Sequence, residues 1–483
     1  MADVILVQPK AGGYSETVQR PMLPLALLAA ARRIVGTRSV RIIDMRVDDN
    51  WRGRLETILS TEPVCVGITS ITGSQLRSAV KAASLVREQG DVPIVWGGVH
   101  ASLLPDQTLA SGLADVVVIG DGDETFPRLV DALAEGRDLS RIDGIAFRKG
   151  KRTVHTKPAP FVDLDEQPDL PYNLVDIEEY VQMYDGRRTL VVQTSRGCPH
   201  SCRFCVNPCY NSSKWRGQSA DRVQDVFASM RERFGVENLW LADDNFFVDM
   251  SRARAIARGL VESGSELTWE VPGTHATSVL AMREGTLGLM QNAGCRRMYI
   301  GVESGSDRVL KAIGKTITVD KVLKANKLLA DTEIIPTYNF ILGFPGETGE
   351  EVQATIDLVF RLLDENPQAE VAPLYCFTPY PGTVLYDEAV EAGFEPPGDL
   401  DGWADFEWSR LNVPWLDEEQ RRRLESLYFY SLFLDRKYRH DLDSPQLQAL
   451  ARIYSPVARA RVRNMFLDAP LELKLKRWLL GGP

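Results

Sequence analysis

Short apolar runs that alternate with amphipathic stretches are the feature that most restricts the fold of this 483-residue chain. Helical patterns, such as those over 22–34 and 74–89, separate the runs. Five runs rich in Val and Ile lie in the first 150 residues, at 3–8, 38–44, 64–70, 93–98 and 115–120. Strands that are apolar throughout and alternate with helices are typical of a parallel sheet covered on both faces. We therefore predict a doubly wound α/β domain over residues 1–150, with its ligand at the carboxyl ends of the strands.

A second alternation follows a stretch of different character. Residues 151–187 are rich in Pro and acidic side chains and have little periodicity, which predicts a linker. Six further strand candidates alternate with helical patterns, at 189–195, 238–243, 267–271, 297–303, 336–343 and 370–377. Six such units within residues 188–390 predict a partial (β/α)6 barrel, whose chemistry lies at the carboxyl ends of the strands. Residues 391–483 are predicted to form a mainly helical C-terminal domain.

The first predicted barrel strand leads directly into a cysteine-rich loop. Residues 196–208 have the sequence RGCPHSCRFCVNP, and four of the seven cysteines of the chain are Cys198, Cys202, Cys205 and Cys209. Thiolates bind Zn²⁺ or iron–sulfur clusters. A zinc ribbon or a buried patch of cysteines is one interpretation, although a position after a strand that opens a βα series does not suit a ribbon.

The composition argues against several function classes. The 56 basic and 66 acidic residues give a net charge of −10, which argues against a general binder of nucleic acid or of anionic membranes. The sequence has no run of about 18 apolar residues, so we expect no transmembrane helix. The first residues, MADVILVQPK, carry an acid and enter a predicted strand, so they do not form a secretory signal. We expect a cytoplasmic protein, in which a cysteine cluster binds metal or performs redox chemistry.

The spacing C-x3-C-x2-C, with Phe204 before the third cysteine, resembles the radical S-adenosylmethionine (SAM) superfamily. The resemblance implies that Cys198, Cys202 and Cys205 hold a 4Fe-4S cluster whose open iron binds SAM. In that family one electron cleaves SAM to a 5′-deoxyadenosyl radical, which abstracts a hydrogen atom from the substrate. The electron comes from a donor such as flavodoxin or ferredoxin. Cys209 is not assigned as a ligand and is a candidate catalytic residue.

Further stretches, in the order expected for the same superfamily, follow later strands. LADDNFF (241–247) is similar to the motif that holds the SAM amino group, although its two acids depart from the commoner Gly-Gly-Glu form. YIGVESGSD (299–307) is similar to the motif that meets the ribose or methionine end, and FILGFPGET (340–348) to the one that frames the adenine. The resemblance assigns SAM contacts to Asp243, Asp244, Glu303, Ser304, Gly343, Pro345 and Gly346.

Plainer interpretations of these stretches stay open. Each aspartate of the first motif is also explained as a helix cap, and the other two motifs as ordinary strand–turn–helix junctions. CFTPYPGTVLY (376–386) resembles a loop of the cobalamin-dependent group. Its Tyr380 is a candidate catalytic residue that reaches the substrate, or else part of a simple Pro-rich turn.

The first domain resembles the cobalamin-binding domain of that same branch. The cobalamin motif has three parts: Asp-x-His-x-x-Gly, Ser-x-Leu and Gly-Gly. Ser70-Ile71-Thr72 and, after 24 intervening residues, Gly97-Gly98 are similar to the second and third parts. The resemblance therefore assigns Ser70, Thr72, Gly97 and Gly98 to the buried tail of cobalamin.

The first part of the cobalamin motif is missing. The loop after the first strand has no histidine, because the five histidines lie at 100, 155, 200, 275 and 440. No motif histidine is thus available as the lower ligand of cobalt. A degenerate domain without cobalamin stays an alternative.

The resemblance implies a cobalamin-dependent radical SAM methyltransferase. In this family methylcobalamin gives its methyl group to an unactivated carbon, less often to phosphorus, of a small-molecule biosynthetic intermediate. Alternatives are a cyclase or ring-rearranging enzyme similar to the anaerobic magnesium-protoporphyrin ester cyclase, a radical SAM enzyme without cobalamin, and a non-catalytic metal-binding scaffold. Aromatic residues of the C-terminal region, Trp403, Trp408 and Trp415, belong to a core or cover the open side of the barrel, and we expect the region to contribute to that cover.

Overall fold

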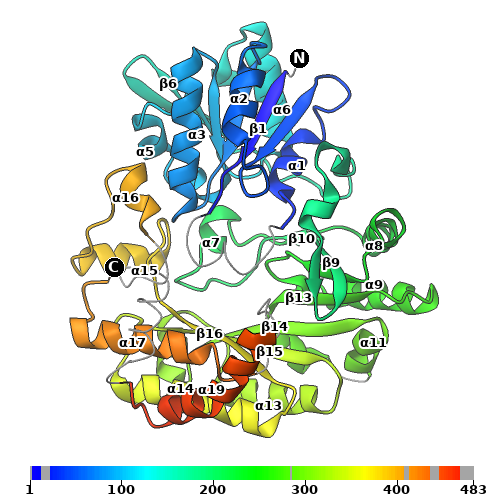
Figure 1. Ribbon diagram of the computed structural model, residues 1–483, viewed down its shortest axis with the longest axis vertical. Helices are drawn as coiled ribbons and strands as arrows, with labels where there is room; N and C mark the ends of the chain where they lie inside the picture. The colour runs from blue at the N-terminus through cyan, green and yellow to red at the C-terminus, as the bar shows by residue number, and fades with distance from the viewer. Residues whose placement is uncertain (1–2, 12–21, 283–284, 407–412, 436–444, 468–483) are drawn as a thin grey trace.

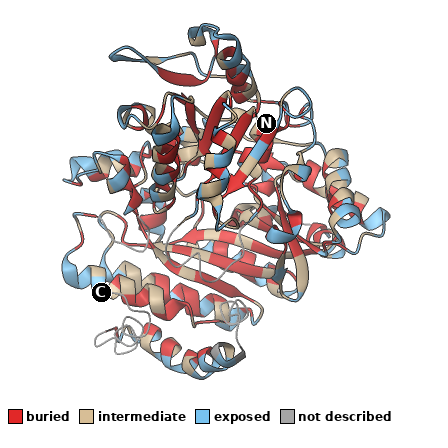
Figure 2. Ribbon diagram, turned by 45° about the horizontal axis from the view of Figure 1, so that its top comes forward, coloured by how far each residue is buried: buried red, intermediate tan, exposed pale blue. Residues whose placement is uncertain are grey.

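A computed structural model describes residues 3–11, 22–282, 285–406, 413–435 and 445–467. It contains two seven-stranded sheets, drawn one above the other in Figure 1, and helices of the C-terminal region that run along one side of both. Buried residues concentrate in the two sheets (Figure 2). Among the helices in the described ranges, none is long and apolar enough to cross a membrane.

The first sheet confirms the doubly wound α/β fold. Its strand order is β2-β1-β3-β4-β5-β6-β7, and the first five strands are parallel. These strands are β1 (Val4–Gln8), β2 (Val40–Asp44), β3 (Cys65–Thr69), β4 (Ile94–Gly97) and β5 (Val116–Val118). Two antiparallel strands that the sequence analysis did not predict extend the sheet, β6 (Ile145–Lys149) and β7 (Arg152–His155).

Helices cover both faces of this sheet because successive strand residues point to opposite sides. Val4 and Leu6 pack with α1 (Leu25–Ala31) and α6 (Gly122–Glu135), whereas Ile5 and Val7 pack with α2 (Trp51–Leu59) and α3 (Gln75–Gln89). Shorter helices, α4 (Gly98–Leu103) and α5 (Pro105–Ala110), follow β4. Both faces are therefore apolar, as the continuous Val and Ile runs predict.

The second sheet confirms the partial barrel. Its order is β16-β15-β14-β13-β12-β9-β8, in which six strands are parallel and β8 (Gln182–Tyr184) is an antiparallel edge. The parallel strands are β9 (Arg187–Val192), β12 (Asn238–Leu241), β13 (Thr268–Thr274), β14 (Cys295–Glu303), β15 (Ile335–Leu342) and β16 (Glu370–Cys376). The helices between them are α8 (Ala220–Phe234), α9 (Met250–Glu262), α10 (Ala276–Ala281), α11 (Thr286–Asn292), α12 (Asp307–Ala312), α13 (Val319–Ala330) and α14 (Gly349–Glu365).

The stretch 151–187, expected as a linker, supplies an edge strand to each sheet, β7 and β8. Between these strands lie two short 3-10 helices, η3 (Tyr172–Leu174) and η4 (Ile177–Tyr180). The Tyr180 hydroxyl donates a hydrogen bond of 2.9 Å to Asp44 at the end of β2. The stretch is thus bonded to both domains, to the first through β7 and Tyr180 and to the barrel through β8.

The C-terminal region is divided between the two sheets. Trp403 on α16 (Leu400–Ala404) is buried in the core of the first domain, after α15 (Val384–Glu391). By contrast, α17 (Glu418–Ser431) lies along the barrel edge strand β16, and α19 (Pro445–Arg463) packs on α17 and α14. The Leu374 N–H of this edge strand donates 2.9 Å to Ser431 Oγ. Helix α17 therefore covers a free barrel edge, in line with the expected cover; Trp408 lies outside the described residues.

Candidate active site

The cysteine loop lies at the carboxyl end of β9, between the two sheets (Figure 1). The short strands β10 (Ser195–Arg196) and β11 (Arg216–Gly217) pair at its base, and α7 (Asn207–Tyr210) lies between them. Cys198, Cys202 and Cys205 are half-buried free thiols. Asn245 Nδ2 lies 3.6 Å from Cys198 Sγ, and the Asn207 N–H lies 3.4 Å from Cys205 Sγ. Such donors stabilise sulfur ligands of an iron–sulfur cluster.

The three thiols form a donor set that suits a cluster. Burial raises the pKa of the Cys205 thiol to about 12, and the nearby Cys202 and Cys198 act in the same direction. Thiols in such surroundings ionise only with a compensating cation. Ligands of a four-iron cluster bind separate irons, so three thiols spaced along one loop are a suitable donor set for it.

Asp243 and Asp244, which follow β12, differ in their surroundings. Asp243 is buried and accepts hydrogen bonds from Thr194 N and Oγ1, both at 2.7 Å, and from Ser195 Oγ at 2.6 Å. Asp244 is exposed, and its Oδ2 accepts a bond of 2.7 Å from Gly197 N, just before the first cysteine. Asp243 therefore joins β12 to the end of β9, and Asp244 is the one available for a ligand.

A buried lysine that the sequence analysis missed lies beside Glu303. The Lys315 ammonium is 2.8 Å from Glu303 Oε1 and donates a second bond of 2.8 Å to the Gly301 carbonyl. Burial opposes the charge, but Glu303 and then Cys202 raise the pKa of Lys315 overall. A Cβ at Gly301 would lie 2.7 Å from Glu303 Oε1 and 2.9 Å from Lys315 Nζ, so a larger residue there would displace the ion pair. Glu303 itself has a φ of +71°, which is strained for a residue with a side chain.

Two stacked histidines lie next to this ion pair. The rings of His200 in the cysteine loop and His275 after β13 are 4.1 Å apart. Burial lowers the pKa of His275 to about 3, and Lys315 acts in the same direction. Its Nε2 is buried and has no hydrogen-bond partner among the described residues. Both imidazoles were predicted to lie away from the cobalamin motif, but no sequence signal placed them together.

The expected adenine loop, residues 343–346, contacts the cysteine loop. Phe344 packs on Phe204, with ring centroids 5.7 Å apart. Gly343 has a φ of +82°, its N–H donates 2.6 Å to Glu347 Oε2, and its carbonyl accepts from Trp415 Nε1 at 3.1 Å. The neighbouring Pro345 and Gly346 continue this turn into α14.

Ser304 has a structural environment. It is fully buried, its Oγ lies 3.3 Å from Thr355 Oγ1, and it accepts a bond of 3.1 Å from Ser306 N. These contacts hold the turn after β14 against α14. The structure therefore brings Glu303, but not the Ser304 hydroxyl, to the centre of the site.

Tyr380 and Cys209 lie where three parts of the chain meet. Cys209 donates a hydrogen bond of 2.5 Å to the Gly382 carbonyl in the loop after β16. A Cβ at Gly382 would also lie 3.3 Å from Leu103 of the first domain. Tyr380, at the start of the same loop, packs edge-on against Phe406 with centroids 6.2 Å apart. Both residues thus join the cysteine segment, the last barrel loop and the first domain.

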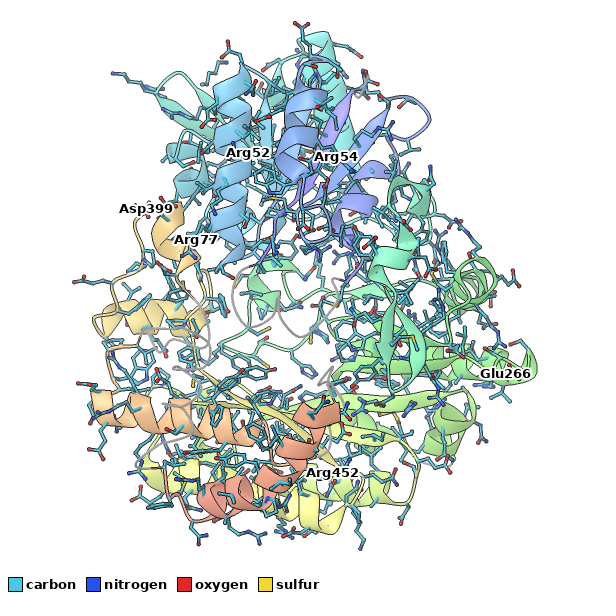
Figure 3. The ribbon with its side chains drawn as sticks, in the orientation of Figure 1. Arg52, Arg54, Arg77, Glu266, Asp399 and Arg452 are labelled. Carbon is cyan, nitrogen blue, oxygen red and sulfur yellow. The ribbon has the colours of Figure 1, made fainter. Side chains whose placement is uncertain are left out.

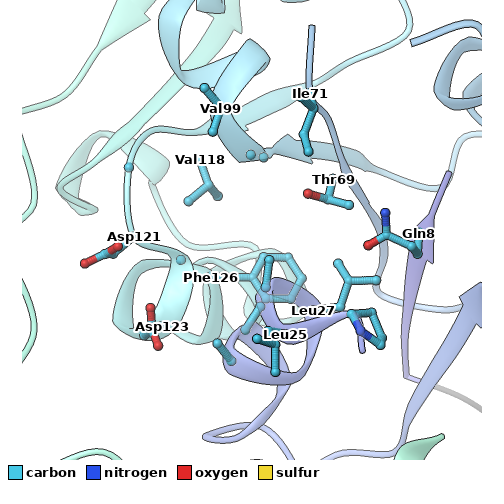
Figure 4. A pocket seen from close by; sticks show the side chains of 18 of the residues that line it. Gln8, Leu25, Leu27, Thr69, Ile71, Val99, Val118, Asp121, Asp123 and Phe126 are labelled. Atoms are coloured by element: carbon cyan, nitrogen blue, oxygen red, sulfur yellow. The ribbon is translucent and has the colours of Figure 1, made fainter. Parts of the chain in front are cut away.

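A cavity of about 510 Å³ lies between the first sheet and helices α1 and α6. Strands β1, β3, β4 and β5 form its floor, and Leu27 and Phe126 line its helical side (Figure 4). Its other wall comes from the barrel and the cysteine segment, including Arg196, Tyr210 and Asp244. The carboxyl ends of the two sheets therefore face one another across this cavity, as expected.

The cavity fits a flat apolar group. A Cβ at Gly67 would lie 2.7 Å from Leu6 Cδ2 and 3.2 Å from the Phe126 ring, so a side chain there would fill the slot. Gly97 also lines the cavity, and a Cβ built there would have no atom within 4 Å. Gly98, with a φ of +87°, instead lets α4 approach β3, because its Cβ would lie 2.5 Å from the Ser70 carbonyl.

The residues of this strand end that line the cavity are not the expected Ser70 and Thr72. Thr69 and Ile71 line it (Figure 4), whereas Ser70 and Thr72 do not. Ser70 is fully buried on the opposite side, where Oγ donates 2.8 Å to the Gly97 carbonyl and accepts 3.2 Å from Ala101 N. Thr72 Oγ1 lies 3.0 Å from Nδ1 of the buried His100. A shift of one residue along a strand end reverses the face that a side chain presents.

Two family models match the chain. The model of the radical SAM superfamily matches residues 192–359, and that of the B12 binding domain matches residues 18–130. An uncharacterized methyltransferase of Pyrococcus horikoshii is 32% identical over 81% of this chain and 83% of its own length. The chain belongs to the B12-binding branch of the radical SAM superfamily. The cofactors of this radical SAM enzyme are a 4Fe-4S cluster, SAM and cobalamin, and the thiol set and the apolar cavity fit two of them directly.

Other relatives support the class expected from the sequence, a cobalamin-dependent radical SAM methyltransferase. Cytidylyl-2-hydroxyethylphosphonate methyltransferase of Streptomyces wedmorensis is 26% identical over 86% of this chain and 87% of its own. The anaerobic magnesium-protoporphyrin IX monomethyl ester cyclase of Rubrivivax gelatinosus is 26% identical over 80% and 69%. The solved structure of OxsB with aqua-cobalamin and SAM shares the fold, with a TM-score of 0.76 and 17% identity over 99% of this chain and 75% of that chain.

Proposed function

We propose that this enzyme transfers a methyl group to an unactivated carbon of a small biosynthetic intermediate, with phosphorus as the second choice of acceptor atom. One observation carries the proposal: a single cavity has Thr69 and Gly97 of the first domain on one side and Asp244, beside the cysteine loop, on the other. When bound, the cluster and SAM supply a radical that removes a hydrogen atom from the substrate, and methylcobalamin supplies the methyl group. The chain contributes placement, since it brings both cofactor sites to one space.

We assign the cluster to Cys198, Cys202 and Cys205, and the SAM ammonium to Asp244. A carboxylate next to the open iron offers the charge-assisted bond that an ammonium requires. Asp243 has protein donors on both of its oxygens, so it positions the end of β9 instead. Lys315, held by Glu303, offers the positive charge that the SAM carboxylate requires.

We assign the base of the cobalamin tail to the slot beneath Thr69. Thr69 and Ile71, one residue before the expected pair, take the places of Ser and Leu in the Ser-x-Leu motif. Gly67 and Gly97 keep the slot open for the base. Among the described residues that line the cavity there is no histidine, so none of them is an imidazole ligand for the lower face of cobalt.

The reaction needs one electron for each cleavage of SAM. We propose that a reduced carrier such as flavodoxin or ferredoxin delivers it, and that the enzyme therefore works in the cytoplasm, where such carriers and reduced thiols coexist. Cys209 and Tyr380 lie at the rim formed with the first domain, and we propose that they position the last barrel loop around the substrate.

Cyclisation or ring rearrangement is the second candidate. The similarity to the Rubrivivax cyclase favours it, since that relative covers most of this chain. The two reactions use the same cofactor sites but give different products. A methyltransferase product gains one CH₂ unit, whereas a cyclase product loses hydrogen or changes a ring.

Isotope labelling separates the two candidates even while the substrate is unidentified. Host cells that express the wild-type enzyme or Cys198→Ala would receive cobalamin and methionine with a CD₃ group, and their metabolites would be compared by mass spectrometry. We expect a metabolite that carries an intact CD₃ group only in cells with the wild-type enzyme. An enzyme-dependent metabolite without the label would favour cyclisation or rearrangement.

A further inference from the structure

The segment that carries the three cysteines is bonded to the first domain at one short turn, Gly120–Asp123. Arg196, two residues before the first cysteine, places Nη1 at 2.7 Å from Asp123 Oδ2 and 3.2 Å from Asp121 Oδ1. Arg216, after the last cysteine, places Nη2 at 2.5 Å from Asp121 Oδ2. Between them, the Tyr210 hydroxyl donates 3.1 Å to the Gly120 carbonyl. Both ends of the cysteine segment therefore meet the same four residues.

These contacts are shielded from water. The Asp123 side chain is 2% exposed and also pairs with the buried Arg32, the residue after α1. Burial opposes ionisation of this carboxyl, but Arg196 and then Arg32 hold its pKa below the ordinary value. Removing one partner of a buried, doubly paired carboxylate lowers the free energy of unfolding far more than removing one partner of a surface ion pair.

The same turn is a wall of the cofactor cavity. Asp121 and Asp123 line the cavity together with Arg196 and Tyr210, and Figure 4 shows both aspartates beside Phe126. The turn begins α6 at Gly122 and has a φ of +79° at Gly120. A group bound in the cavity therefore contacts the turn from one side, while the cysteine segment holds it from the other.

We propose that the turn Gly120–Asp123 couples the two cofactor sites energetically. Corrinoid in the cavity then stabilises the cluster in the cysteine loop, and the cluster tightens corrinoid by the same factor, since binding linkage is reciprocal. Arg196, Tyr210, Arg216 and Asp123 act as positioning residues in this coupling. The inference rests on the proposed assignment of cobalamin to this cavity.

Iron release tests the coupling on the full-length enzyme with its cluster. Anaerobic protein would be mixed with an iron chelator, with and without saturating hydroxocobalamin, and the rate of iron release recorded by absorbance. For the wild type we expect corrinoid to slow release by about 5-fold or more, the lower end of effects between coupled sites. Corrinoid affinity, measured by equilibrium dialysis, should be higher for protein with the cluster than for protein from which the cluster has been removed.

Two variants separate the turn from general stability. Tyr210→Phe removes one hydroxyl and leaves every buried charge paired, so we expect it to fold. Corrinoid should then slow iron release at least about 2-fold less than in the wild type, because one buried hydrogen bond is lost. Arg196→Lys, which cannot bond Asp121 and Asp123 with a planar fork, should reduce the protection by corrinoid further. Arg77→Lys is the control at an exposed ion pair. Arg77 on α3, labelled in Figure 3, forms a 2.7 Å pair with Asp405 at the end of α16.

The outcomes distinguish this inference from the proposed function. Wild-type protection that persists unchanged in Tyr210→Phe and Arg196→Lys would overturn the role of the turn. Wild-type enzyme that binds corrinoid but releases iron equally fast with and without it would overturn the coupling alone. Wild-type enzyme that binds no corrinoid would overturn the assignment of the cavity, and the coupling with it.

Discussion

Thr69 and Ser70 are adjacent hydroxyl residues in opposite surroundings. Thr69 lines the cavity, whereas Ser70 is buried and bonded to Gly97 and Ala101. We expect Thr69→Val to weaken binding of cobalamin about 5-fold, because a bond between the hydroxyl and the tail base contributes about 1 kcal/mol. Equilibrium dialysis measures the affinity, and cobinamide, which lacks the tail base, should bind both proteins equally.

Ser70→Ala is the paired control for this prediction. It should lower the free energy of unfolding by about 1–2 kcal/mol, because it leaves the buried Gly97 carbonyl and Ala101 N–H without their partner. Its affinity for cobalamin should equal that of the wild type. The reverse pattern would be weakened cobalamin binding in Ser70→Ala and unchanged binding in Thr69→Val. It would restore the assignment of Ser70 to the cobalamin tail, as first drawn from the sequence.

The cysteines of the loop should differ in their effect on bound iron. Cys202→Ser removes a proposed ligand. The reconstituted variant should therefore hold less than about one iron per chain, whereas a complete cluster holds about four. Cys209→Ser should keep the wild-type iron content, since Cys209 bonds the Gly382 carbonyl and is not assigned as a ligand. Iron and sulfide assays on both variants check this, and iron loss in Cys209→Ser would make that thiol a ligand.

Glu347 gives the stability of the enzyme a specific pH dependence. Burial raises its pKa from 4.5 to about 7, although the Gly343 and Phe344 N–H groups oppose the shift. The folded protein therefore binds one more proton than the unfolded chain between these values. The stabilisation is fully present below about pH 4.5 and is lost as pH rises through about 7.

Glu347→Gln removes this titration. The wild type should lose up to about 3 kcal/mol of unfolding free energy between about pH 5 and 8 through this group, and the variant should lose correspondingly less. Urea unfolding at the two pH values measures the difference. Parallel pH profiles for the two proteins would show that the carboxyl is ionised throughout.

At the scale of elements, α16 is a structural part of the first domain although it follows the barrel in sequence. Trp403 is 1% exposed and packs edge-on against Phe406, with centroids 4.9 Å apart. We expect Trp403→Ala to lower the unfolding free energy by about 3–5 kcal/mol, because it leaves a large cavity in a packed core. Urea unfolding of the purified protein measures the loss.

Leu450→Ala on α19 is the control for this change. Its side chain is 62% exposed, so the substitution should change stability by less than about 0.5 kcal/mol. A Trp403→Ala protein as stable as this control would mean that α16 does not belong to the core of the first domain.

Most strands could be predicted because they are buried on both faces and therefore appear as continuous apolar runs. The edge strands β7 and β8 could not, since β7 has the mostly exposed sequence RTVH and β8 has only three residues. Their pairing depends on neighbours that are distant in sequence. The division of the C-terminal helices between the two sheets was equally hidden, because Trp403, which is buried in the first domain, and Trp415, which packs against both cores, carry the same apolar signal.

The parts of the candidate site that depend on spacing along the sequence could be predicted. The parts that depend on tertiary packing could not. The cysteine spacing identified the loop, and the order of later motifs brought Asp244, Glu303 and the 343–346 turn to it. Lys315 was missed because a lysine is buried only by tertiary contacts, here with Glu303 and Gly301. The choice between Thr69 and Ser70 depends on which face each side chain presents, and the run 69–72, with three hydroxyl residues and one apolar residue, does not fix that register.

For the whole molecule, two connections hold the two sheets with their carboxyl ends facing. The turn Gly120–Asp123 meets the cysteine segment, and the C-terminal region spans both sheets, with α16 packed into the first domain and α17 along β16. The cavity between the sheets is therefore a built space with walls from both domains. Radical and methyl-transfer chemistry on one substrate requires this shared space, which neither domain forms alone.

The amount of corrinoid and iron in the purified enzyme tests this account most directly. The protein would be isolated without oxygen from cells supplied with cobalamin, and its corrinoid, iron and sulfide quantified per chain. The account predicts one corrinoid and about four irons in the same molecule. About four irons without corrinoid, in protein that also fails to bind added cobalamin, would contradict it.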